Sequence, residues 1–174
     1  MLSIETWQIL VCYLFMALQF DSFSGKGAYH SENEDYLLRN GYAKGGLRYL
    51  CFLADGQGGR PDGGVASRVA CESAMACSQT YPWEEFSMAS TWDDIFAAAD
   101  AAVSEKCEGA TTLIGIALDD NATSGASCGD SKVYLLDQAS QQLLELTDRQ
   151  QKNPPIGDRC NQAGMFYQNW QQGG

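Results

Sequence analysis

The chain has 174 residues, the size of one ordinary domain, and 45% of them are hydrophobic, enough for a buried core and too many for a disordered protein. Its formal net charge is −11, from 11 basic and 22 acidic residues. A protein this acidic repels phosphate backbones and anionic lipid, so the composition argues against nucleic-acid binding. The acidic composition is compatible with binding of phosphorylated substrates, provided that a metal ion reverses the local field.

Seven cysteines are scattered along the chain without a Cys-x-x-Cys pair, and His30 is the only histidine, which argues against a zinc site. Several cysteines lie in apolar runs, so we interpret them as reduced core residues of a cytoplasmic protein, with Cys128 packed between sheets. The apolar segment 8–20 is shorter than the roughly 20 residues of a membrane span, and no Lys or Arg precedes it as in a signal peptide. We therefore expect an opening strand and no membrane span.

Strands are predicted for the first third of the chain. After an N-terminal extension over residues 1–14, a half-alternating pattern predicts a strand over Phe15–Phe23. A short strand follows at Tyr36–Leu38, and Asn40-Gly41 is typical of a hairpin turn. A longer apolar strand is predicted over Leu47–Ala54.

Two helices are predicted next. Beyond Gly63-Gly64, apolar residues recur at helical spacing on one face up to Cys77. The segment 79–90 is predicted to be a loop. A second helix is expected to start at Thr91, where Asp94 completes a capping-box pattern, and to end before Gly109.

Strands return in the last part of the chain, at Thr111–Leu118, Ala126–Leu136 and Leu143–Leu146, and no regular structure is predicted from Asp148 onward. Because hairpin-type turns join neighbouring strands and the helices are consecutive, the order favours antiparallel sheets carrying a helical layer, an α+β fold. Neither helix opens with a glycine-rich phosphate-binding pattern, which argues against a nucleotide-binding fold.

Three acidic motifs adjoin the predicted strands. Asp55 ends an apolar strand and is followed by Gly56-Gln57-Gly58-Gly59, where the missing Cβ atoms let the backbone approach a ligand closely. Glu34 and Asp35 precede another strand, and Asp130 belongs to a third motif. Taken alone, each of these motifs most commonly marks a turn. Three acids converging at one end of a sheet would form a site for a hard cation.

Six motifs follow one another along the chain in a set order. They are Asn33-Glu34-Asp35, Ala54-Asp55-Gly56-Gln57-Gly58-Gly59, Gly63-Gly64-Val65-Ala66-Ser67, Gly109-Ala110-Thr111-Thr112, Cys128-Gly129-Asp130-Ser131-Lys132-Val133-Tyr134 and Leu146-Thr147-Asp148. In this order they resemble the metal-dependent Ser/Thr phosphatases of the protein phosphatase 2C family, bacterial type. The resemblance covers about residues 20–155 and implies an α+β sandwich of two antiparallel β-sheets flanked by α-helices, within a domain over residues 15–174.

The resemblance also implies a metal centre. Asp55 would bridge two Mg²⁺ or Mn²⁺ ions, the Gly56 carbonyl would add a ligand, and Glu34 and Asp35 would bind the metals directly or through water. Asp130 resembles the ligand of a third, looser ion. Asp55 and Asp35 are therefore the candidate catalytic residues, because paired metals activate a water for attack on phosphorus.

The chain departs from the family pattern in three respects, one of which, Gln57 in place of a histidine of many members, is common in the bacterial type. His30 stands where the family carries an arginine that holds the substrate phosphate, and an imidazole offers one donor in place of a charged fork. Arg60 and Lys26 are the alternative phosphate contacts. The later acidic motifs of the family have no match after Asp130, so the domain is expected to be C-terminally incomplete.

The sequence thus predicts a cytoplasmic metal-dependent phosphatase that acts on phosphoserine or phosphothreonine in a protein, opposing a Ser/Thr kinase, with poor activity in this chain alone. The alternative is a catalytically inactive phosphatase-like domain with a regulatory or partner-binding role. His30 and the missing motifs favour the alternative, whereas the intact motifs around Asp55 and Asp130 favour the enzyme.

Overall fold

An antiparallel sheet of five strands forms the centre of the molecule. The computed structural model describes residues 11–14, 17–20, 25, 32–42, 48–137, 141–150, 153–160 and 163–169. Across the sheet the strands are β3 (Asp35–Tyr42), β4 (Arg48–Asp55), β5 (Leu113–Leu118), β6 (Ala122–Cys128) and β9 (Gly164–Asn169).

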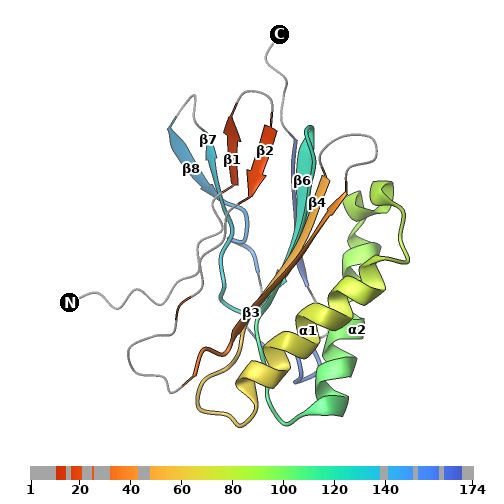
Figure 1. The fold of residues 1–174 in the computed structure, drawn as a ribbon, viewed down its shortest axis with the longest axis vertical. Coiled ribbons are helices and arrows are strands. Elements are labelled where there is room, and N and C mark those ends of the chain that lie inside the picture. Colours follow the sequence, from red (N-terminus) through yellow and green to blue (C-terminus); the bar gives the residue numbers. More distant parts are fainter. Residues whose placement is uncertain are drawn as a thin grey trace, which may run out of the picture.

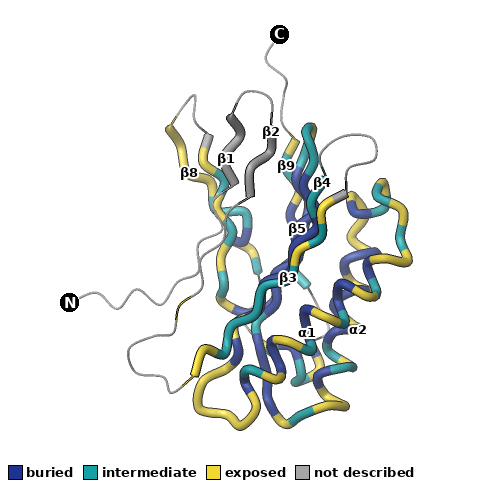
Figure 2. Tube along the Cα trace, viewed as in Figure 1, coloured by how far each residue is buried: buried dark blue, intermediate teal, exposed yellow. Residues whose placement is uncertain are grey.

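Two helices cover one face of this sheet (Figure 1). α1 (Gly63–Ser78) and α2 (Ala89–Lys106) pack against each other, and the 3₁₀ helix η1 (Trp83–Ser87) lies between them in sequence. Their sheet-facing sides are buried and their outer sides are exposed (Figure 2). The largest fully buried side chain is Trp92, whose ring would lie only 2.5 Å from a Cβ placed on Gly115. Glycine in β5 therefore makes room for the indole.

The opposite face of the sheet carries two hairpins, which lie away from the helices in Figure 1. They pair β1 (Val11–Leu14) with β2 (Ala17–Phe20), and β7 (Tyr134–Asp137) with β8 (Gln142–Glu145). A small apolar cluster fills this side of the sheet: Leu53, Ile114, Ile116, Leu118 and Phe166. Helices, sheet and hairpins form the expected α+β sandwich, and the predicted fold class is confirmed. In the part of the chain described here, no helix is both long and apolar enough to cross a membrane.

The predicted helices are confirmed, with one change at an end. The second helix begins at Ala89, and its N-cap makes no side-chain hydrogen bond, so the capping box predicted at Thr91 and Asp94 is wrong. Asp94 instead accepts a hydrogen bond from the Tyr81 hydroxyl at 2.9 Å, and Thr91 is buried. A tertiary contact has taken the place of the local cap. The loop predicted over 79–90 also contains η1.

Several predicted strand boundaries are wrong. Asn40-Gly41 does not form a turn: the two residues pair with Leu50 and Tyr49 inside the β3–β4 ladder. The single strand predicted over Ala126–Leu136 is divided into β6 and β7. Gly129, at φ 108°, causes this break, because such a backbone conformation cannot continue a strand.

The end of the chain holds an element that the sequence did not predict. β9 lies beyond Asp148 and pairs with β6 along its whole length. Near the other end, the strand predicted over Phe15–Phe23 corresponds to β2, which forms a hairpin with β1. Residues 1–10, 15–16 and 21–24 lie outside the described residues, and the boundary between the extension and the domain stays a prediction.

Cys128 is placed on the other side of the sheet from the one predicted. It belongs to the large buried cluster between the sheet and the helices, together with Ala126 two residues earlier on β6. Side chains two residues apart in a strand point to the same face, so the alternation of β6 assigns Cys128 to the helical side.

Candidate metal centre

The register of β3 and β4 places two of the predicted acids directly opposite each other. Asp35 pairs with Asp55 at one end of the ladder, and two positions further along Leu37 pairs with Leu53. The two leucines contact the apolar cluster on the face away from the helices. By strand alternation the two carboxylates continue that face, with Cβ atoms about 4.5–5.5 Å apart. Asp35 is half-buried and Asp55 is exposed.

Gly56 fits tightly between two backbone segments next to this acid pair. Its N–H donates to the Glu34 carbonyl at 3.1 Å. A Cβ at Gly56 would overlap the carbonyl of Gly63 and lie 2.7 Å from the carbonyl of Glu34. Only glycine can occupy this position, because the atoms in the way belong to the backbone and cannot rotate aside.

Glu34 is fixed by its main chain, and its carboxylate faces the start of α1. Its carbonyl accepts hydrogen bonds from Gly56 N–H and from the buried hydroxyl of Ser67. One carboxylate oxygen would lie 2.8 Å from a Cβ on Gly63. Free N–H groups at a helix N-terminus favour a nearby negative charge. Helix α1 therefore supports the Asn33-Glu34-Asp35 motif through both the main chain and the side chain.

Two threonines hold the backbone of Asp55. Its N–H donates to the Thr112 hydroxyl at 3.0 Å, and its carbonyl accepts from Thr112 N–H at 3.0 Å and from the Thr111 hydroxyl at 2.8 Å. Thr111 is buried. Three hydrogen bonds to one residue fix the backbone at the end of β4, and so the direction of the Cα–Cβ bond that carries the carboxylate.

Asp130 is linked to the same threonine through its neighbours. The hydroxyls of Ser131 and Thr112 lie 2.8 Å apart. On the other side, Gly129 lies against Thr112, where a Cβ on the glycine would be 2.6 Å from the Thr112 methyl group. Asp130 itself is exposed. Thr112 thus connects the strand end that carries Asp55 with the turn that carries Asp130.

The structure gathers the predicted ligands only in part. Asp35 and Asp55 are brought together, whereas Glu34 faces α1 and Asp130 is joined through Thr112. Among the residues that the structure describes, no group of three His, Cys, Asp or Glu side chains is arranged to hold a metal ion. The donors at this end of the sheet are nonetheless all oxygen atoms, which suits Mg²⁺ or Mn²⁺ and does not suit softer metals.

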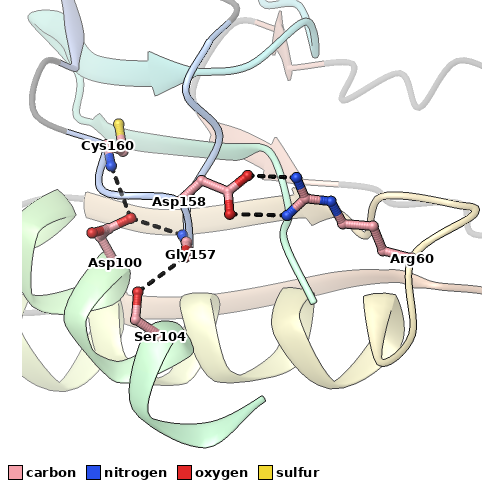
Figure 3. Close-up of polar contacts among 6 residues, drawn as sticks. All are labelled: Arg60, Asp100, Ser104, Gly157, Asp158 and Cys160. Carbon is pink, nitrogen blue, oxygen red and sulfur yellow. Dashed lines mark hydrogen bonds and ion pairs between the residues drawn. The ribbon is translucent and has the colours of Figure 1, made fainter. Parts of the chain in front are cut away.

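The predicted phosphate contacts have different outcomes. His30 and Lys26 lie outside the described residues. Arg60 donates to Asp158 through two nitrogens, at 2.9 and 2.7 Å (Figure 3). Hydrogen bonds to this carboxylate and its negative charge raise the pKa of the Arg60 guanidinium. The guanidinium is engaged with a second part of the chain, so the alternative phosphate contact at Arg60 is not supported.

Sequence reasoning missed the hydroxyl residues that position the acids. Ser67, Thr111 and Thr112 lie in two of the six motifs, but no role followed from their spacing. Each contacts an acidic motif that lies 33 to 57 positions away along the chain. The sequence signal was that these hydroxyls lie within three positions of the glycines that begin α1 or precede β5.

A sheet end with these acids on an α+β sandwich agrees with the comparison to known families. The protein phosphatase 2C family matches residues 27–153, and the chain belongs to this family. No curated protein matched the chain with significance.

Solved structures show the same fold at low sequence identity. The catalytic domain of the serine/threonine protein phosphatase PstP, in complex with two manganese ions, is 21% identical with a TM-score of 0.65, over 86% of this chain and 71% of that one. A PstP structure from Mycobacterium tuberculosis is 20% identical with a TM-score of 0.65, over 86% of this chain and 72% of that one. The serine/threonine phosphatase Stp1 from Staphylococcus aureus is 18% identical with a TM-score of 0.62, over 84% of this chain and 69% of that one.

Proposed function

We propose that this chain is a metal-dependent phosphatase domain that hydrolyses phosphoserine or phosphothreonine in proteins. The observation that carries the proposal is the β3–β4 register, which pairs Asp35 with Asp55 at one end of the ladder. Two carboxylates directly opposite each other repel, and a divalent cation held by both would offset that repulsion. Membership of the protein phosphatase 2C family supports the same assignment.

Asp35 and Asp55 are the proposed principal ligands, with Glu34, the Gly56 carbonyl and Asp130 as further oxygen donors. When bound, Mg²⁺ or Mn²⁺ ions would supply an activated water and balance the charge on the phosphoryl oxygens. The PstP structure with two manganese ions favours a centre of this kind. We propose two such ions, Mg²⁺ or Mn²⁺, with a third, looser one at Asp130.

The protein's own contribution is to fix the acids before any ligand arrives. Thr111 and Thr112 hold the Asp55 backbone, and the Gly56 N–H ties the end of β4 to the Glu34 carbonyl. Backbone positions fixed in this way keep two like charges side by side and reduce the reorganisation needed on binding. We further propose a phosphoprotein substrate that is the product of a Ser/Thr kinase, a cytoplasmic location, and His30 as the contact for the substrate phosphate.

Manganese binding by the acid pair can be tested without turnover. We expect Mn²⁺ at about 100 times its Kd to raise the Tm of the chain by roughly 5–10 °C. Asp55→Asn and Asp35→Asn should each remove most of this rise. Asp93→Asn, an exposed site on α2, should keep it and serves as the matched control.

Hydrolysis of a phosphothreonine peptide with Mn²⁺ then tests the reaction itself. Asp55→Asn should lower the low rate expected of this chain to that of the peptide without enzyme, because the loss of a metal ligand removes most of the transition-state charge balance. Equal Mn²⁺ shifts in the wild type and in Asp55→Asn would overturn the metal assignment. A shift without hydrolysis would instead identify a metal-binding domain that lacks catalysis.

A further inference from the structure

Two cysteines from distant parts of the chain meet in the core. Cys128 ends β6, and Cys160 lies 32 positions later, with the two sulfur atoms 2.8 Å apart. Both are buried, with 1% of Cys128 and 8% of Cys160 exposed. In the described part of the chain, the thiols of Cys71, Cys77 and Cys107 contact main-chain carbonyl oxygens. Cys128 contacts the Pro154 carbonyl at 3.3 Å and, in addition, the sulfur atom of Cys160. The pair is therefore distinct from the other core thiols.

The backbone that carries Cys160 is fixed to α2. One carboxylate oxygen of Asp100 accepts hydrogen bonds from Gly157 N–H at 2.7 Å and from Cys160 N–H at 3.0 Å (Figure 3). The hydroxyl of Ser104, one turn further along the helix, donates to the Gly157 carbonyl at 3.0 Å. Three contacts to one helix thus set the position of Cys160 relative to the sheet.

The same segment is attached to two further parts of the chain. Ile156 exchanges two backbone hydrogen bonds with Thr111, each 3.0 Å long. Asp158 forms the two-nitrogen ion pair with Arg60, which lies in the turn that follows Asp55 and Gly56. The backbone at both cysteines is therefore held by contacts other than the one between the two sulfur atoms. The sulfur atoms meet without any movement of the backbone.

We propose that Cys128 and Cys160 are a redox modification site, and that they form a reversible disulfide that links the segment 153–160 covalently to β6. Bonded sulfur atoms lie about 2.05 Å apart, so the two sulfurs have to approach by only about 0.8 Å. Side-chain rotation supplies such a shift. The pairing follows from geometry, because the Asp100 contacts bring Cys160 to this cysteine.

Hydrogen peroxide is the oxidant class that reaches a buried pair, because it is scarcely larger than water. The Cys160 thiolate, the more accessible of the two, attacks a peroxide oxygen and releases hydroxide, which leaves a sulfenic acid. Cys128 then attacks the Cys160 sulfur and expels the sulfenic hydroxyl as water. Two thiols and one peroxide give one disulfide and two waters. The contact with Cys160 and burial raise the pKa of Cys128, which fits its role as the second, resolving thiol.

The bond would stabilise the fold. It closes a loop of 32 positions and so removes conformational freedom from the unfolded chain. We expect oxidation to raise the Tm by roughly 5–10 °C and a dithiol reductant to reverse the rise. A disulfide of this kind in a reducing compartment is typical of redox sensing. Neither metal binding nor phosphatase activity is needed for this bond to form.

Peptide mapping of the peroxide-treated chain tests the pairing directly. Trypsin releases Cys128 in the peptide 107–132, which also contains Cys107, and Cys160 in the peptide 160–174. We therefore use Cys107→Ser as the parent protein, so that a cross-link between these peptides has one interpretation. The expected product is the joined pair, lighter by two hydrogen atoms than the sum of the reduced peptides and separated again by reductant.

Matched variants complete the experiment. Cys160→Ser in the same parent should lose both the joined peptides and the oxidation-dependent Tm rise, whereas Cys77→Ser should keep both. Unlinked Cys128 and Cys160 in the folded, peroxide-treated parent would overturn the proposal, and so would preferential pairing of either one with another cysteine. This peptide map decides the question even if Cys160→Ser fails to fold.

Discussion

Single residues without side-chain bulk shape the candidate site. Gly56 lies where the end of β4, the Glu34 main chain and the start of α1 meet, and a Cβ there would overlap backbone on two sides. Gly64 is the second residue of the same helix, and a Cβ added to it would lie 3.7 Å from its nearest neighbour, an ordinary contact distance. The two glycines therefore play different roles although they stand in adjacent motifs.

Gly56→Ala should destabilise the protein, because the obstructing carbonyl groups cannot rotate aside. We expect a loss of about 1–3 kcal/mol in the free energy of unfolding, the usual cost of overpacking, together with weaker Mn²⁺ binding. Gly64→Ala is the matched control and should leave stability unchanged or slightly raised, since alanine favours a helix. Chemical denaturation measures both. Equal effects of the two substitutions would contradict the tight fit described at Gly56.

At the scale of elements, α2 has two tasks. Its apolar side contributes Ile95, Phe96 and Ala99 to the large buried cluster between helices and sheet. Its C-terminal half holds the segment 153–160 through Asp100 and Ser104. Asp100 is half-buried and accepts two backbone hydrogen bonds with one oxygen. An irregular segment with few residues in the core depends on such contacts for its position.

Asp100→Ala should therefore release this segment. The substitution leaves two backbone N–H groups without their acceptor, and we expect a loss of about 2–4 kcal/mol in the free energy of unfolding. Asp100→Asn keeps an acceptor oxygen and should lose less. Asp93→Ala, exposed on the same helix, should change little. Urea denaturation of the four proteins checks the order, and an Asn variant as unstable as the Ala variant would contradict it.

At the scale of the whole molecule, cysteine thiols are buried on both faces of the sheet. Cys51 lies on β4, and Cys71 lies on α1 within the helical layer. Burial raises the pKa of Cys51 to about 12, although the charge of Arg39 opposes the shift, and burial also raises the pKa of Cys71. Both thiols hold their protons more tightly in the folded than in the unfolded chain.

Global stability should consequently fall in alkali. The stabilising contribution of a thiol with a raised pKa is complete below its unfolded pKa of about 9 and is lost as the pH rises toward the folded value of about 12 for Cys51. In this window the unfolded chain binds fewer protons, and each such thiol lowers stability by up to about 1.4 kcal/mol per pH unit. Urea midpoints at pH 7, 9 and 10.5 check the slope. Cys51→Ala should flatten it, and an unchanged slope would contradict this source of the alkaline loss.

Patterns of short range in the sequence predicted much of this protein. Apolar residues at helical spacing predicted α1 and most of α2, and apolar runs predicted β4 and β5. The Asp-Gly motif predicted that Asp55 would stand at the end of a strand, and the order of six motifs indicated the family. In each case, neighbouring residues carry the information, because period and turn chemistry act over a few positions.

Only the tertiary structure decided which distant residues meet. It paired Asp35 with Asp55, engaged Arg60 with Asp158, turned Cys128 toward the helices beside Cys160, and recruited β9 to the sheet. These outcomes depend on strand register and on contacts between segments far apart in sequence. A shift of one residue in register would exchange the faces of a strand, and no local pattern around Arg60 or Cys128 encodes the partner that packing supplies.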